Sequence, residues 1–138
     1  MRHRNKDKKF GRSTSHRKAL VSALICGLVA EKRIKTTLQK AKVARSEAEK
    51  LVTLARKGTM AARRKAVAEL RSERHAALLC NEIAPQFTDR PGGYTRIVKL
   101  GQRHGDGAEM ALLEWVGMTI PSKRKKAKPA ESSKPAEA

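Results

Sequence analysis

Apolar residues first recur at helical spacing in the segment ALVSALICGLVA, where leucines stand four residues apart. This spacing predicts a buried helix over roughly residues 15–31, with Ser13 or Ser15 as its N-cap. The charged run that precedes the segment also gives it the outline of a signal peptide. Its twelve apolar or small residues are too few to span a bilayer, so we interpret the segment as a core helix.

Three further helices are predicted downstream. Segment 37–58 is amphipathic and ends on a glycine, and the shorter helices 60–70 and 73–84 have Thr59 and Ser72 as N-caps. In the last of them, Leu79, Cys80 and Ile83 are expected to point inward, before the prolines and glycines of residues 85–93 end the helical part. The apolar positions of segment 37–58 share one face: Leu38, Ala41, Ala44, Ala48, Leu51, Val52 and Ala55.

The final third of the chain changes to an alternating pattern. Segment 94–100 alternates, with Tyr94, Arg96, Val98 and Leu100 on one face, and segment 109–117 is a second apolar run. The stretch RIKTT, rich in β-branched residues, supplies a possible third strand. The predicted class is α+β, with about four helices packed with a small mixed sheet of three strands.

The glycine-rich stretch GQRHGDG lies between the last two strands. A phosphate-cradling loop would open a helix, and no GxGxxG or GK[ST] motif is present. We therefore interpret the stretch as the turn of a hairpin, with Asp106 and Gly107 as a positive-φ pair. Arg103 and His104 at its tip either contact a backbone phosphate or are merely solvated, and the sequence leaves both interpretations open.

The net charge of the chain indicates what kind of partner it binds. The 138 residues include 32 Lys and Arg against 13 Asp and Glu, a net charge of +19 with a pI near 10.7. Such a charge favours a polyanionic partner, with nucleic acid first and an anionic membrane surface second. Only 3% of residues are aromatic, so we expect a small core and a free protein of marginal stability.

Both ends of the chain are basic and poor in apolar residues. We expect residues 1–14 to form a basic arm that folds on its partner, residues 15–117 a globular domain, and residues 118–138 a disordered low-complexity tail. A solvated arm is the alternative. The first eighteen residues hold a single acid, Asp7, and these cations: Arg2, Arg4, Lys6, Lys8, Lys9, Arg12, Arg17 and Lys18.

Catalytic and metal-binding patterns are missing from the sequence. Cys26 and Cys80 stand apart from each other and from histidines, so we predict packed, reduced thiols, as suits a reducing cytoplasm. No nucleophile, base and orienting group can be assembled from the scattered histidines and helix-surface acids. We therefore expect neither an enzyme nor a protein with a cofactor, a metal or a small-molecule substrate.

Physical reasoning points to binding of structured RNA. Affinity would come mainly from phosphate neutralisation, because no recognition helix, zinc finger or stacking platform is apparent. A histone-like DNA-compacting protein is the main alternative. A membrane-surface protein is the other, and the low overall hydrophobicity argues against it.

Three blocks of sequence add a resemblance. MRHRNKDKKFGRSTSHRKAL, RIKTTLQKAK and PQFTDRPGGYTRIVKLGQRHGDGAEMALLEWV, in this order over roughly residues 1–117, resemble the bacterial large-subunit ribosomal protein L-seventeen family. The resemblance implies an α+β domain on large-subunit ribosomal RNA near the exit of the nascent-peptide tunnel, beside neighbouring large-subunit proteins. It implies a structural role in translation in the cytoplasmic ribosome, without enzymatic activity or cofactor.

The resemblance also implies particular RNA contacts: Arg2, His3, Arg4, Arg12, His16, Arg17, Lys35, Thr36, Thr37, Tyr94 and Arg96. The charge and polarity of the arm, strands and hairpin add further candidates: Lys6, Lys8, Lys9, Ser13, Lys18, Lys40, Lys99, Arg103 and His104. The predicted mechanism is scaffolding, in which the globular part docks on RNA while the arm threads between RNA helices and neutralises phosphates.

Overall fold

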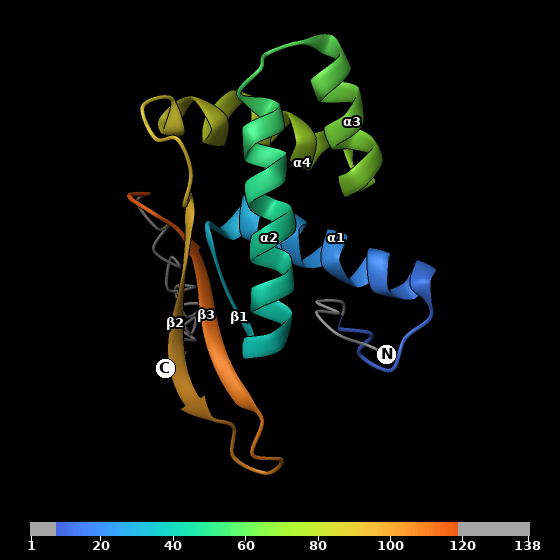
Figure 1. The fold of residues 1–138 in the computed structure, drawn as a ribbon, viewed down its shortest axis with the longest axis vertical. Coiled ribbons are helices and arrows are strands. Elements are labelled where there is room, and N and C mark those ends of the chain that lie inside the picture. The colour runs from blue at the N-terminus through green and yellow to red at the C-terminus, as the bar shows by residue number, and fades with distance from the viewer. Residues whose placement is uncertain (1–7, 119–138) are drawn as a thin grey trace, which may run out of the picture.

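The computed structural model describes residues 8–118, so Arg2, His3, Arg4, Lys6 and the segment 119–138 lie outside the described part of the chain. Helices come first and a hairpin last (Figure 1). The elements in chain order are α1 (Thr14–Glu31), β1 (Arg33–Thr37), α2 (Leu38–Ala55), α3 (Met60–Leu70), α4 (Glu73–Leu78), a π-helical turn (Leu79–Ile83), a 3₁₀ turn (Ala84–Phe87), β2 (Thr95–Gln102) and β3 (Glu109–Trp115).

Side-chain caps begin three of the helices where the sequence predicts them. The Ser13 hydroxyl accepts a hydrogen bond from the backbone N–H of His16 at the start of α1. Thr59 and Ser72 cap α3 and α4 in the same way. Because each cap satisfies an N–H group that the helix itself leaves unpaired, these residues fix where the helices begin.

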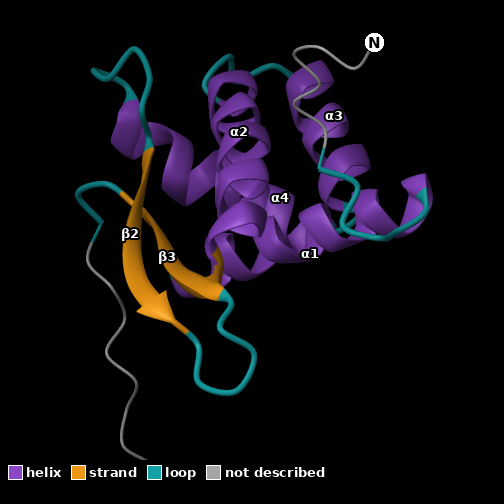
Figure 2. Cartoon of the chain, turned by 60° about the horizontal axis from the view of Figure 1, so that its bottom comes forward, coloured by secondary structure: helices purple, strands orange, loops and turns teal. Residues whose placement is uncertain are grey.

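The sheet has the strand order β1-β3-β2, with β3 in the centre. Both pairings are antiparallel, so the α+β class is confirmed and the expected mixed sheet is in fact antiparallel throughout. The reason is the strand order: β2 runs parallel to β1 but is not its neighbour, and β3, which lies between them, runs against both. The helices lie to one side of the strands (Figure 2).

The core forms where the helices meet the inner face of the sheet. Every apolar position predicted to share one face of α2 is buried. Across from α2, Leu113 and Trp115 of β3 are buried, and the rings of Phe87 and Tyr94 lie 5.2 Å apart beside them. This close packing of small alanines with a few large side chains makes one continuous core from few aromatic residues.

The predicted helix over residues 73–84 differs from the structure. The α-helix ends at Leu78 and continues as a π-helical turn and a 3₁₀ turn. Pro85 is the physical reason for an end in this region, because it has no N–H and its ring blocks the preceding helical turn. Leu79 and Ile83 are buried as predicted, and Cys26 and Cys80 are free, partly buried thiols packed on the core, which confirms that prediction.

Candidate nucleic-acid interface

The first group of predicted site residues lies where the arm meets α1. The arm ends in a tight turn in which Phe10 and Gly11 have positive φ and the Arg12 N–H donates to the Lys9 carbonyl. Lys8, Lys9, Ser13, His16 and Lys18 are exposed, and Arg12 and Arg17 are half-buried. The first turn of α1 contains no acidic residue. This end of the molecule therefore combines side-chain cations with the positive end of the α1 dipole. We call these seven residues the arm group.

A second group lies around the start of α2 and the hairpin. Thr37 ends β1, Lys40 lies in the first turn of α2, and Lys99 lies on β2. Leu38 and Lys99 line the same small hollow, so the start of α2 lies beside the part of the hairpin next to its turn. Arg103 and His104 lie at the tip of the hairpin. We call Thr37, Lys40, Lys99, Arg103 and His104 the hairpin group.

The hairpin tip is shaped by its own ion pair. Arg103 donates from Nε to Asp106 at 2.9 Å, with a second contact from Nη2 at 2.5 Å. The hydrogen bonds and charge of Arg103 hold the pKa of the Asp106 carboxyl far below its ordinary value. The turn closes through backbone bonds between Arg103 and Ala108 and between Gly107 and Arg103, as predicted for a hairpin. Positive φ occurs at Gly105 and Gly107 and not at Asp106, so the predicted positive-φ pair of Asp106 and Gly107 is wrong in its first member. The physical reason is that glycine, which has no Cβ, adopts positive φ without strain. His104 is left exposed beside the pair.

Glu114 is the residue that sequence analysis missed most clearly. It is 2% exposed, and Arg33 of β1 donates to its Oε2 at 2.6 Å while Arg96 of β2 donates to its Oε1. Burial by itself raises the pKa of Glu114, but the hydrogen bonds and charges of the two arginines outweigh it and lower the pKa. Arg96 is thus held in a cross-strand bridge. Only the strand register, which the alternation pattern does not give, reveals this bridge.

Two predicted contacts are placed inside the fold. The Tyr94 side chain is 1% exposed and Thr36 is 8% exposed. Tyr94 precedes β2 and turns toward α2, so the expectation that it shares a face with Arg96 is wrong. Its ring packs on the ring of Phe87. This contact buries the large apolar surface of Tyr94, which the strand alternation would have left exposed. Neither side chain offers an exposed surface to RNA.

Arg56 holds the segment before β2 in place. From the C-terminal end of α2 it donates to the carbonyls of Thr88 and Arg90 at 2.7 and 2.9 Å and to the Tyr94 hydroxyl at 2.8 Å. Hydrogen bonds from Thr53 and from Arg56, together with the charge of Arg56, lower the pKa of Tyr94. The hydrogen bonds of the Arg56 guanidinium therefore stabilise the fold.

Replacing Arg56 with Lys is expected to loosen this segment. A single ammonium cannot reproduce the planar fork that reaches three acceptors, so we expect a loss of about 1 kcal/mol in the free energy of unfolding. Amide hydrogen exchange of the N–H of Arg90, which donates to Phe87, should accelerate. The neighbouring swap Lys57→Arg is the control, and an equal effect from it would contradict a specific role for Arg56.

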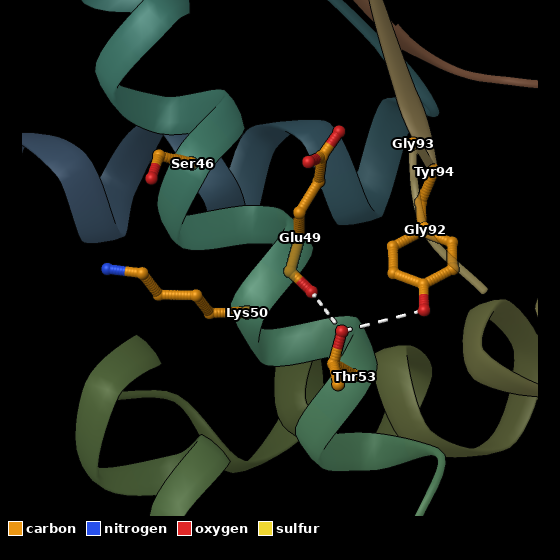
Figure 3. Close-up of a pocket in the computed structure, with 7 residues that line it drawn as sticks. All are labelled: Ser46, Glu49, Lys50, Thr53, Gly92, Gly93 and Tyr94. Carbon is orange, nitrogen blue, oxygen red and sulfur yellow. Dashed lines mark hydrogen bonds between the residues drawn. The ribbon is translucent and has the colours of Figure 1, made fainter.

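A shallow, open hollow of about 430 Å³ lies between α2 and the loop before β2 (Figure 3). Its charged groups are already engaged: Glu49 accepts from Arg45 and Thr95, and Lys50 pairs with Glu47. In Figure 3 the Thr53 hydroxyl lies between the Glu49 carbonyl and the Tyr94 hydroxyl, and it bonds to both. The hollow is therefore part of the scaffold that joins α2 to the sheet.

Further cations on the helices were not singled out from the sequence, because basic residues interleaved with acids on a helix resemble an ordinary solvated face. They are exposed at the C-terminal end of α2 and along α3 and α4: Lys57, Arg63, Arg64, Lys65, Arg71 and Arg74. Within residues 8–118, no helix is long and apolar enough to cross a membrane. The same residues contain no cluster of three or more metal-ligating side chains.

Comparison with known proteins gives a consistent result. The family model described as "Ribosomal protein L17" matches residues 20–116. A large ribosomal subunit protein bL17 from Methylacidiphilum infernorum is 53% identical over 131 residues, which cover 95% of this chain and 100% of the relative. Proteins of the same name from Thermomicrobium roseum and Fusobacterium nucleatum are 51% and 46% identical, each over 84% of this chain and 99% and 100% of the relative.

Proposed function

The chain belongs to the ribosomal protein L17 family, and on that premise we propose that it is a structural constituent of the large ribosomal subunit that binds large-subunit ribosomal RNA. The family consists of structural ribosomal proteins and not of enzymes. The net charge of +19 supports this proposal, because such a charge favours a polyanionic partner.

The arm group carries the proposal. Lys8, Lys9 and Lys18 are exposed around the start of α1, and the first turn of this helix has no acid to neutralise them. Among the described residues, none of these three side chains forms an ion pair, whereas the cations Arg33, Arg45 and Arg96 do. A cluster of uncompensated cations at the positive end of a helix suits the phosphates of an RNA backbone.

The hairpin group provides a second contact. The eighteen residues of α1 place its two ends about 27 Å apart. In Figure 1 the start of α1 lies at the right of the fold and the hairpin turn at its lower end, so the arm group and the hairpin turn lie at different places on the surface. We propose that each group neutralises a different stretch of RNA backbone, which makes the protein a rigid spacer between RNA elements.

The position within the subunit is part of the same proposal. We place the protein near the exit of the nascent-peptide tunnel, with neighbouring large-subunit proteins beside it, as the family resemblance implies. Chemical cross-linking of purified subunits tests this placement, because its products identify the proteins in contact with the chain. Cross-links only to proteins far from the tunnel exit would contradict it.

The binding mode is tested by the salt dependence of affinity for large-subunit ribosomal RNA. In the triple variant Lys8→Gln, Lys9→Gln, Lys18→Gln we expect the slope of log K against log[salt] to become shallower by about 2–3, close to one unit per lost phosphate contact. The affinity should fall by a similar factor for different RNA sequences, because phosphates carry no sequence information. Filter binding across a salt series measures both quantities.

The matched control removes the same charge elsewhere. The variant Lys42→Gln, Arg45→Gln, Lys50→Gln changes the exposed side of α2, where Arg45 and Lys50 already pair with acids. We expect its salt slope to stay close to that of the unmodified protein. Equal slopes for both triple variants would show that net charge alone drives binding. Equal affinity for duplex DNA in competition would favour the DNA-compacting alternative.

A further inference from the structure

The outer face of the sheet, which points away from α2, has an unusual composition. An antiparallel sheet with one open face normally alternates apolar and polar residues along each strand. The central strand β3 instead contains the continuous run Met110–Leu113, so it is apolar on both faces. Such a run is typical of strands that are covered on both sides.

The strand register defines this outer face. Leu112 pairs with Lys35 on one side and with Val98 on the other, so the three share a row. The inner row beside it contains the core residue Leu113. Val98 is 42% exposed, and Leu100, two residues further along β2, is 47% exposed. Exposed large apolar side chains on adjacent positions mark interaction surfaces more often than scattered single ones do.

The rim of the face is cationic. Lys35 is exposed, and the Arg33–Glu114–Arg96 bridge holds two guanidinium groups against one carboxylate, which leaves one positive charge in excess. The bridge also fixes the three strands side by side at this end, so the face is rigid before any partner binds. Rigid apolar surface with a charged rim is the usual composition of a protein-binding site.

We propose that Val98, Leu100, Leu112 and Lys35 form a docking surface for another protein, which presents a short apolar segment with a carboxylate beside it. The apolar side chains of the partner pack on Val98, Leu100 and Leu112, and its carboxylate pairs with Lys35. The inference rests on the proposed function, because the partner is sought among the proteins of the large subunit. The family resemblance implies that Lys35 and Arg96 contact RNA, whereas this inference assigns both residues to a protein contact.

Three other occupants fit the chemistry less well. RNA gains little from aliphatic side chains, and the row Lys35–Leu112–Val98 has no aromatic ring for a base to stack on. A second copy of this chain would bring two cationic rims together. The segment 119–138 is itself rich in lysine and has Ile120 as its only large apolar residue. A carboxylate-bearing protein segment complements both the apolar centre and the rim.

The test places a benzophenone amino acid at Val98 in the full chain, in cells whose large subunits are then purified. Irradiation should join the chain to another protein, giving a product that protease degrades and nuclease does not. The control is the same probe at Met60, which is 64% exposed but lies on α3, and which should not give this product. A nuclease-sensitive product at Val98, a cross-link within the chain or to a second copy, or no product would overturn the proposal.

The carboxylate is tested separately with a carbodiimide, which joins an amine to a carboxylate. In purified subunits Lys35 should form an amide with an Asp or Glu of the same partner, identified by mass spectrometry. Lys35→Arg keeps the charge but removes the amine, and should abolish this cross-link only. Loss of the chain from the subunit fraction would instead count against the proposed function, so the two failures are distinguishable.

Discussion

Replacing Trp115 with Ala is expected to remove about 4 kcal/mol from the free energy of unfolding. The side chain is 2% exposed, its Nε1 donates to the Leu28 carbonyl at 3.0 Å, and its ring lies 6.0 Å from that of Phe87. The indole thus joins the end of β3 to α1 and to the 3₁₀ turn. Because small domains are stable by only about 5–15 kcal/mol, this loss is a large fraction of the total free energy of unfolding.

Urea denaturation followed by circular dichroism measures this loss. Tryptophan fluorescence cannot be used, because the variant lacks the only tryptophan of the chain. Trp115→Phe keeps an aromatic ring but loses the N–H, and should cost about 2 kcal/mol. Met60→Ala truncates an exposed apolar side chain and should change stability by less than about 0.5 kcal/mol. A similar loss in the Met60 and Trp115 variants would contradict the central place of the indole.

Ribosomal RNA should rescue part of the Trp115→Ala defect. A partner that binds only the folded state adds to its stability in proportion to the logarithm of its concentration over Kd. The melting temperature of the variant should therefore rise when large-subunit RNA is added. Such a rescue would support the proposed function, because a chain with so few aromatic residues is expected to gain part of its stability from its partner.

Local patterns were sufficient to predict the helices. The apolar face of α2, the N-caps Ser13, Thr59 and Ser72, and the hairpin turn follow from the spacing of a few residue types within one or two turns. Two wrong expectations are local, the α-helix over all of residues 73–84 and the positive φ of Asp106, and the others concern contacts between distant segments. Tyr94 continues the strand alternation in the sequence, yet the aromatic cluster with Phe87 and the bond from Arg56 turn it inward.

The charges show the same limit. Sequence alone gives a strong net positive charge but does not show which cations are already paired. Arg33 and Arg96 are spaced far apart in the chain, and only the register of three strands brings both to Glu114. The exposed cations of the arm group could be proposed from composition, whereas the outer face of the sheet became visible only when strand pairing separated Leu112 from Leu113.

The Arg33–Glu114–Arg96 bridge is expected to make stability depend on pH. The pKa of Glu114 is lowered in the folded protein from its ordinary value of 4.5. As the pH falls below 4.5, Glu114 therefore becomes protonated in the unfolded chain while it stays ionised in the folded chain. The unfolded state then binds more protons, so stability decreases as the pH falls. The contribution of the bridge is complete above pH 4.5 and is lost as the pH falls through the lowered pKa of the folded state.

Glu114→Gln should remove this contribution. The amide is the same size but carries no charge, and it can accept through only one of its two polar atoms, so two arginines lose charge-assisted bonds. We expect the variant to be less stable than the unmodified protein by about 2 kcal/mol at pH 7, with the difference shrinking toward acid pH. Urea denaturation at a series of pH values between 7 and 3 gives the difference directly.

The comparison of the two proteins isolates Glu114, because the lowered pKa of Asp106 is present in both and cancels in the difference. Glu109→Gln removes a carboxylate from an exposed position on the same strand and should leave stability nearly unchanged. A pH-independent difference between Glu114→Gln and the unmodified protein would mean that packing, and not the charge of the bridge, fixes the strands. In that case the rigidity of the outer face would not depend on Arg33 and Arg96, and Glu114→Gln should leave the cross-link at Val98 intact.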